Sequence, residues 1–235
     1  MSPTLIAAAL AIRLVASHGY PEGAPPGFSG GFGEQACDAC HFEATINTGP
    51  GKVLLAGVPD RFTPGERYTL TLTLTRPGMR LGGFQLTARF EDGGAQAGGL
   101  APGPAHAEHL TVESQNGIQY VGQHASGTGL AAPDTASWTL IWTAPPSGGP
   151  VVFHVAANAA DGDGTAEGDY VHTTTAVSSP DGAASGRTGP YRPARLGAIY
   201  APAPANRPCS SRTAAPSSSR GQSSGSTSAI GIVTP

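Results

Sequence analysis

The sequence predicts an all-β protein built as an antiparallel β-sandwich, and two observations carry this prediction. Of the 235 residues, 34 are glycine and 22 are proline, and because both types interrupt helices, a helical bundle is excluded. From about residue 52 onward, short runs of alternating apolar and polar side chains are separated by turn residues, which is the pattern of half-buried strands. Eight such runs within about 125 residues are typical of an immunoglobulin-like sandwich of two packed sheets.

The clearest predicted strand covers residues 68–75, where leucines alternate with threonines. Side chains two positions apart in a strand lie on the same face, so the leucines form one face and the threonines the other. Residues 138–142 and 151–155 place bulky apolar side chains on one face in the same way. The full set of predicted strands is 53–55, 68–75, 83–90, 108–112, 118–121, 137–142, 151–157 and 169–174.

The chain divides into four segments by composition. Residues 1–17 form a short apolar stretch ending in the small residues Val15-Ala16-Ser17, which predicts a secretory signal peptide cleaved before His18. The alternative is a buried first strand or helix of a cytoplasmic domain. Residues 18–51 form a Gly/Pro-rich irregular segment, and residues 52–178 form the sandwich domain. A signal peptide implies a secreted, periplasmic or cell-surface protein and an oxidising environment for its cysteines.

The last segment, residues 179–235, has a different composition. It carries a net charge of +5, whereas residues 1–178 carry −8, and nine of the 21 residues from 209 to 229 are serine. A segment with so little to bury is expected to be disordered. Two alternatives remain open: a stalk or spacer at a cell wall, and the product of a shifted reading frame.

Charge and hydropathy exclude several classes of function. The net charge of −3 and the single lysine, Lys52, argue against nucleic acid as a partner, because binding phosphates requires several converging cations. No apolar run is long enough for a membrane span in the mature chain. No Ser-His-Asp order, phosphate loop or pair of carboxylates points to catalysis, so we do not expect an enzyme.

The most specific motif is Cys37-Asp38-Ala39-Cys40-His41. Two thiols at this spacing followed by an imidazole are typical of covalent haem c, with Cys37 and Cys40 as thioether anchors and His41 as the axial iron ligand. The flanking residues allow at most one or two helical turns, so the haem would sit on a loop held against the β domain. Three alternatives stay open: a Cys37–Cys40 disulfide, half of a zinc site, and a thiol redox motif.

A second axial ligand would have to come from elsewhere in the chain. We predict His124, which directly follows a predicted strand, and consider Met79 as a weaker candidate. The other histidines considered, for which ordinary hydrogen bonding is the favoured interpretation, are His106, His109, His154 and His172.

A cluster of acidic residues between the last two predicted strands could offer oxygens to calcium. Its members are Asp161, Asp163, Glu167 and Asp169. The segment lacks the glycine at position six and the distal glutamate of the EF-hand pattern. A polar, glycine-rich turn is therefore the favoured interpretation, and calcium the weaker one.

Several segments together resemble the bacterial Reelin-domain-like family of exported proteins, over about residues 23–177. The segments that carry the resemblance are Gly31-Phe-Gly-Glu-Gln-Ala-Cys37-Asp-Ala-Cys40-His41, Phe62-Thr-Pro-Gly-Glu-Arg-Tyr68, Tyr120-Val-Gly-Gln-His124, Trp138-Thr-Leu-Ile-Trp-Thr-Ala-Pro145 and Val151-Val-Phe-His-Val-Ala-Ala-Asn158. The resemblance implies a Reelin-type sandwich on an exported or surface protein, and it places His124 at a histidine of the family pattern. It implies little about activity.

Two functions follow as hypotheses from the sequence. The first is an exported c-type haem protein in electron transfer or redox sensing, with a redox protein as its partner. The second is a Reelin-like surface module for interaction or adhesion that binds a surface ligand without haem, in which a Cys37–Cys40 disulfide staples the loop. The sequence does not predict an oligomeric state.

Overall fold

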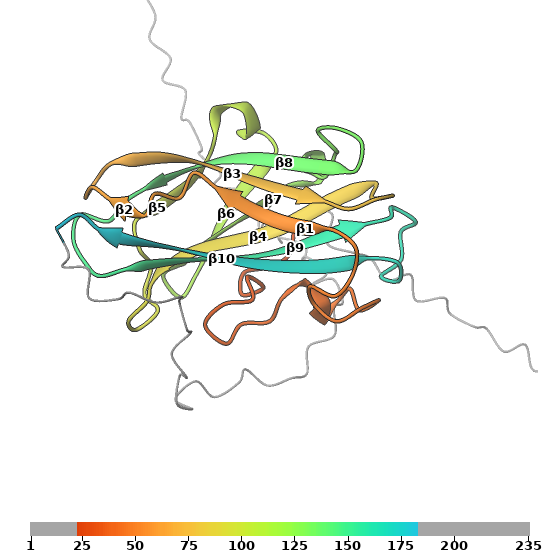
Figure 1. Cartoon of the computed structure of the whole chain (residues 1–235), viewed down its shortest axis with the longest axis horizontal. Coiled ribbons are helices and arrows are strands. Elements are labelled where there is room, and N and C mark those ends of the chain that lie inside the picture. The colour runs from red at the N-terminus through yellow and green to blue at the C-terminus, as the bar shows by residue number, and fades with distance from the viewer. Residues whose placement is uncertain (1–22, 183–235) are drawn as a thin grey trace, which may run out of the picture.

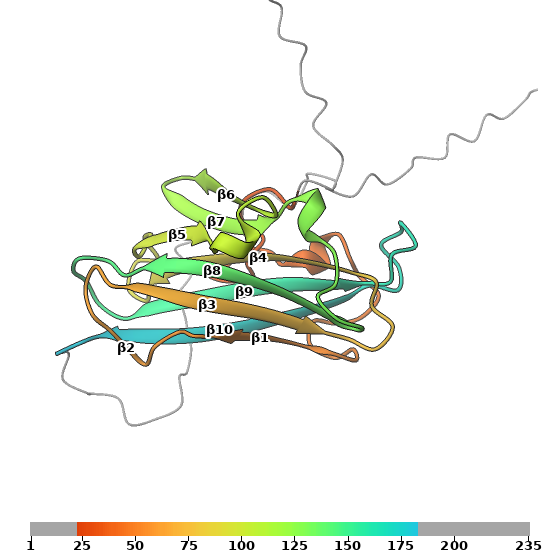
Figure 2. The same ribbon diagram turned by 90° about the horizontal axis from the view of Figure 1, so that it is seen from above.

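The structure is a computed structural model, and it describes residues 23–182. The predicted signal peptide, Cys209 and most of the predicted tail lie outside the described residues. The described chain folds as an all-β sandwich of two sheets, which confirms the predicted fold class (Figures 1 and 2). Within residues 23–182, no helix is long and apolar enough to cross a membrane.

Ten strands and three short 3-10 helices make up the described chain. The four-stranded sheet has the order β1-β3-β8-β5, and the six-stranded sheet has the order β2-β10-β9-β4-β7-β6. The strands are β1 (Lys52–Ala56), β2 (Arg61–Phe62), β3 (Arg67–Thr75), β4 (Leu81–Phe90), β5 (Gly99–Pro102), β6 (Leu110–Gln115), β7 (Ile118–Gln123), β8 (Thr135–Thr143), β9 (Val151–Ala160) and β10 (Tyr170–Pro180), and the 3-10 helices are η1 (Cys37–Ala39), η2 (Pro104–His106) and η3 (Ala125–Gly127).

The core lies between the two sheets. Buried and partly exposed residues alternate along β3 and β8, so one face of each strand contributes its apolar side chains to this core. These strands pair in register along their whole length, so that Leu72 lies opposite Trp138 and Leu70 opposite Leu140. Each of these four side chains is at most 1% exposed. On the facing sheet, Phe153 packs edge to face against Trp142. Burial of these apolar side chains is the main favourable contribution to folding.

The structure differs from the predicted strands at several boundaries. Two short strands, β2 and β5, were not predicted, because runs of two and four residues are too short to show an alternation. The strand predicted at 108–112 runs from Leu110 to Gln115. The strand predicted at 169–174 runs from Tyr170 to Pro180, and its last two residues pair in parallel with β2.

Residues 23–51, which we call the strap, lie on the outer face of the six-stranded sheet. Figure 1 shows this segment, with η1, against β9 and β10. Residues of β9 alternate between the two faces, and the outward set contacts the strap: Gly31 lies over His154, Gly30 near Ala156, and His41 beside Asn158. The irregular segment predicted around the Cys-x-x-Cys-His motif is therefore a cover for one sheet.

Candidate functional site

The strap is attached to the sheet by a buried ion pair. The Arg89 guanidinium on β4 donates to Glu34 Oε1 at 2.6 Å, and the side chains are 7% and 14% exposed. Tyr120 Oη donates to the same oxygen at 2.5 Å, and Ser29 Oγ donates to Glu34 Oε2 at 2.6 Å. The Phe32 ring lies 4.3 Å from the guanidinium carbon. These contacts fix the strap immediately before the Cys-x-x-Cys-His turn.

Close approach to the sheet also explains one glycine of the strap. A Cβ at Gly31 would overlap the ring of His154, so only glycine lets the backbone pass this close to the His154 side chain. His154 also meets the Phe32 ring edge to face, at 5.1 Å between centroids. The glycine density of residues 23–33 therefore serves, at this position, to lay the backbone directly on side chains of β9.

The motif itself forms a single helical turn. The amide of Cys40 donates to the Cys37 carbonyl at 3.1 Å, and the amide of His41 donates to the same carbonyl at 2.9 Å. The second bond closes an α-type turn, in which side chains three and four positions apart lie on the same side. The turn therefore brings Cys37, Cys40 and His41 to one side.

The two cysteines of the motif are not bonded to each other. Cys37 carries a free thiol, and Cys40 is disulfide-bonded. This finding corrects the local Cys37–Cys40 disulfide that the sequence left open as an alternative. Burial, with a smaller contribution from the neighbouring Asp38 carboxylate, raises the pKa of Cys37 to about 12. The thiol is thus protonated at neutral pH, which makes it a poor nucleophile.

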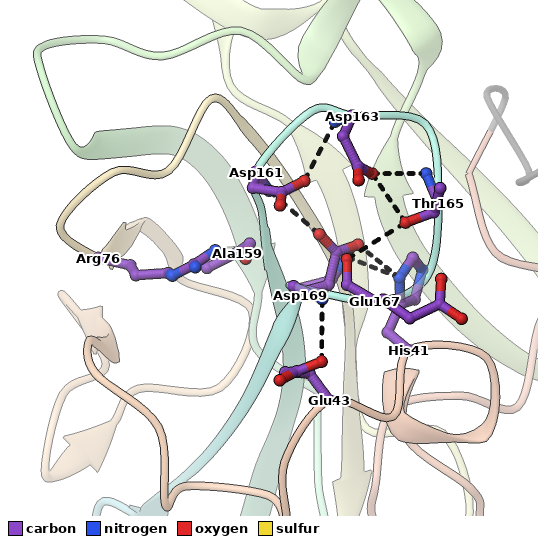
Figure 3. Close-up of polar contacts among 11 residues, drawn as sticks. His41, Glu43, Arg76, Ala159, Asp161, Asp163, Thr165, Glu167 and Asp169 are labelled. Carbon is purple, nitrogen blue, oxygen red and sulfur yellow. Dashed lines mark hydrogen bonds and ion pairs between the residues drawn. The ribbon is translucent and has the colours of Figure 1, made fainter.

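His41 is held by an aspartate that lies 128 residues later in the chain. Its Nδ1 lies 2.7 Å from Oδ2 of Asp169, which precedes β10, and Figure 3 shows the ring facing the carboxylate. Asn158 Nδ2 donates to the same oxygen at 3.0 Å, and the Asp161 amide donates to Asp169 Oδ1 at 3.1 Å. The Asp169 side chain is 3% exposed and that of His41 is 31% exposed.

The surroundings of Asp169 keep it ionised. Burial acts to raise the pKa of this carboxyl, but hydrogen bonds from His41, Asn158 and the Asp161 amide outweigh it, so the pKa lies below its usual value. A carboxylate accepts hydrogen bonds only, so His41 Nδ1 carries a proton and donates it. His41 Nε2 then keeps its lone pair, and it makes no hydrogen bond with the described residues.

In the acidic loop predicted as a weak calcium candidate, the side chains of Asp161 and Asp163 accept hydrogen bonds from the loop itself. In Figure 3, Asp161 accepts from the Asp163 amide at 3.1 Å and Asp163 accepts from the Thr165 amide at 2.7 Å. Such bonds from Asp to a backbone two residues on are typical of turns. No group of three or more His, Cys, Asp or Glu side chains within residues 23–182 is arranged to hold a metal ion.

The two candidates for a second axial ligand lie in different places. Met79 is 2% exposed and belongs to the core between the sheets, so it is not available to the strap. His124 is exposed and follows β7. Strand β4 pairs with β9 at Gly83, opposite Asn158, and with β7 at Gln85, opposite Gly122. His124, two residues past Gly122 in the antiparallel β7, therefore lies toward the end of the sheet at which Asn158 and His41 lie.

A shallow hollow lies against the turn, between the strap and β10. Its volume is about 310 Å³, at the small end of the range for small-molecule sites. The residues that line it are Gly30, Glu34, Gln35, Ala36, Asp38, Ala39, Ile46 and Thr173.

A second surface feature is the outer face of the four-stranded sheet, which we call the threonine face. The positions of β3 and β8 that alternate with the core residues pair across the two strands, for example Thr71 with Thr139 and Thr73 with Ser137. η2 borders this face, where His106 Nδ1 lies 2.8 Å from Thr139 Oγ1. The face consists of Lys52, Leu54, Ala56, Arg67, Thr69, Thr71, Thr73, Thr75, Gly99, Ala101, Thr135, Ser137, Thr139, Ile141 and Thr143, all partly or fully exposed.

Sequence reasoning missed the residues that support His41 and the strap. Asp169 was noticed only as an oxygen donor for calcium, and neither Asn158 nor Glu34 was given a role. The separation of His41 and Asp169 by 128 residues leaves no pattern in the sequence that could join them. The lone buried arginine of β4, Arg89, on a strand whose other outward residues are uncharged, was the available signal for a buried ion pair.

No family model and no curated protein matches the chain. Among solved structures, it is similar to the human F-spondin reeler domain, with 19% identity over 57% of this chain and 92% of that one, at a TM-score of 0.38. It is also similar to a cohesin module of a Clostridium perfringens family 33 glycoside hydrolase, with 13% identity, 57% and 98% coverage, and a TM-score of 0.41. A non-cellulosomal cohesin from Archaeoglobus fulgidus is also similar, with 11% identity over 55% of this chain and 91% of that one, at a TM-score of 0.37. Nothing about function follows from values of this size.

Proposed function

We propose that this chain is an exported, non-catalytic interaction module that binds a protein partner through the threonine face. The observation that supports the proposal is the composition of that face. None of its residues is acidic, and its two charged residues, Lys52 and Arg67, lie at its two ends. The centre of a protein interface is depleted of charged side chains in the same way.

Hydroxyl and methyl groups together suit such an interface. The threonine side chains of adjacent strands stand about 5 Å apart and can donate and accept hydrogen bonds while their methyl groups exclude water. β-branched side chains have few rotamers, so little entropy is lost when a partner orders them. The strap lies on the outer face of the other sheet, whereas the residues of the threonine face are partly or fully exposed.

Site-specific crosslinking in the native host tests this proposal. A photoreactive amino acid at Thr73 is expected to give an adduct of defined mass, whereas the same probe at the exposed Glu113 of β6 gives none. The adduct should disappear with Thr71→Glu, because a carboxylate buried in an uncharged interface is costly. Equal labelling at Thr73 and Glu113, or an adduct that survives Thr71→Glu, would contradict the proposal.

A second candidate function is the covalent attachment of haem c, which the geometry of the turn specifically favours. Cys37, Cys40 and His41 lie on one side of one turn, and His41 Nε2 has a lone pair directed away from Asp169. In this proposal Cys37 and Cys40 would hold the group covalently, and His41 and His124 would be the residues that ligate its iron. When bound, haem would supply one-electron redox chemistry for electron transfer or redox sensing. Attachment requires Cys40 as a thiol, so it must occur before the disulfide of Cys40 forms or after its reduction.

Expression with haem-maturation machinery tests the second candidate. A Soret absorbance that survives acid-acetone extraction is expected for the natural sequence and for the control Asp38→Asn in the same turn. It should be lost with the double substitution Cys37→Ser and Cys40→Ser, which removes both thioether anchors. Purified, exported protein without covalent haem would exclude this function and leave the interaction module as the remaining proposal.

A further inference from the structure

The contacts of Asp169 place it behind His41, on the side opposite Nε2. The carboxylate is nearly fully buried, and both its oxygens are occupied: Oδ2 by His41 and Asn158, and Oδ1 by the Asp161 amide. His41, by contrast, is about one-third exposed. A buried carboxylate that orients a partly exposed imidazole is the arrangement in which the second ring nitrogen is presented to a ligand.

The side-chain amide of Asn158 is oriented by its hydrogen bond to the Asp169 carboxylate. Asn158 is 8% exposed, its Nδ2 faces the carboxylate, and its Oδ1 has no hydrogen-bond partner. The reverse orientation of the amide would set Oδ1 against the Asp169 oxygen, where two acceptors repel. The same Nδ2 lies 3.1 Å from His41 Nδ1. Because the shorter 2.7 Å contact with the carboxylate requires the proton on Nδ1, this second contact is an approach of two donors and not a hydrogen bond. Asn158 therefore offers His41 no acceptor that could compete for its Nδ1 proton.

We propose that Asp169, held in place by Asn158 and the Asp161 amide, is a positioning residue that fixes His41 as the Nδ1–H tautomer and thereby turns Nε2 into a basic ligand for a haem iron. The proposal rests on the second candidate function. A hydrogen bond from an iron-ligating imidazole to a carboxylate increases the basicity of the imidazole. Increased basicity stabilises the ferric over the ferrous ion, so Asp169 would lower the reduction potential of the site.

The first test uses the protein without haem. Nitrogen-15 NMR of the histidine rings should show His41 as the Nδ1–H tautomer in the natural sequence and in Asp163→Ala, a control in the same loop without contact to His41. In Asp169→Ala the population should move to the Nε2–H tautomer, while Asp169→Glu, which keeps the carboxylate, restores part of the original population. Tryptophan fluorescence identifies any variant that fails to fold. An unchanged tautomer in folded Asp169→Ala would overturn the proposal.

The second test uses protein loaded with haem. Asp169→Ala is expected to raise the midpoint potential relative to the natural sequence, whereas Asp163→Ala leaves it unchanged. Equal potentials in Asp169→Ala and the natural sequence would overturn the positioning role while leaving haem attachment intact. Absence of covalent haem in the natural sequence would overturn the second candidate function, and this proposal with it, so the two failures are distinguishable.

Discussion

Two histidines of the six-stranded sheet are held in their neutral form by their surroundings. Burial lowers the pKa of His154, and nearby Arg89 also lowers it while Glu34 opposes this. Burial likewise lowers the pKa of His172, with Arg76 adding to the effect and a hydrogen bond to the Pro50 carbonyl opposing it. His172 is 2% exposed, and its Nε2 has no hydrogen-bond partner. At these positions, a proton costs the folded state more than it costs the unfolded chain.

The sign of the resulting pH dependence follows from this difference. The unfolded chain binds protons at a pKa near 6.5, and the folded state binds them only at lower pH. The free energy of unfolding should therefore fall as the pH drops below about 6.5, until the folded-state pKa values are passed. Urea unfolding at about pH 7.5 and about pH 5.5 measures this loss. His154→Gln and His172→Gln should each make this loss of stability at the lower pH smaller. An equal loss in both variants and in the natural sequence would contradict the prediction.

The strap, as an element, depends on the buried pair of Glu34 and Arg89. Irregular segments have few backbone hydrogen bonds of their own, so side-chain contacts must hold them. Removal of one partner of a buried ion pair leaves the other charge buried and uncompensated. This pair therefore holds the Cys-x-x-Cys-His turn on the sheet together with the contact between His41 and Asp169.

Arg89→Leu should lower the free energy of unfolding by about 3 kcal/mol, because Glu34 then loses its charged partner in a buried position. The double variant Glu34→Gln, Arg89→Leu should lose less than the sum of the two single changes, since no isolated charge remains. Chemical denaturation measures all three, with Arg67→Leu on the exposed threonine face as the control expected to change little. Strict additivity of the two changes would show that Glu34 and Arg89 do not act as a pair.

Along β3, residues that face the core alternate with residues that lie on the threonine face. Leu72 is fully buried between the sheets, whereas its neighbour Thr73 lies on the threonine face. Leu72→Ala should lower the free energy of unfolding by about 3 kcal/mol, through lost burial and the cavity left behind. Thr73→Ala should change it by less than about 0.5 kcal/mol. Similar losses in urea unfolding of the two variants would contradict the assignment of the faces.

At the scale of the whole molecule, the first and last described segments close the fold together. Asn47 of the strap exchanges hydrogen bonds with Thr173 of β10, 126 residues later, and His41 reaches Asp169 over a similar separation. Contacts of such high sequence separation form late, because the entropy of closing the loop must first be overcome. The sandwich is therefore expected to fold before the strap docks on it.

Folding kinetics test this order of events. Trp138 and Trp142, the two tryptophans of the chain, are at most 1% exposed in the core and report on the sandwich. Stopped-flow fluorescence should show that Glu34→Gln increases the unfolding rate and leaves the folding rate nearly unchanged, as expected for a contact absent from the transition state. Leu72→Ala in the core should slow folding. A slower folding rate in Glu34→Gln would mean that the strap docks before or during the rate-limiting step.

The sequence by itself determined the fold class and most of the strands, because alternation with period two is a local property written into neighbouring residues. The Cys-x-x-Cys-His motif of residues 37–41 and the turn glycines could be recognised for the same reason, because each is defined by neighbouring residues. The partners of the site were decided only by the tertiary structure. Asp169 and Asn158 reach His41, and Arg89 reaches Glu34, through pairings of segments far apart in the chain. Sheet order and register fix such pairings, and neither leaves a periodic signal in a single sequence.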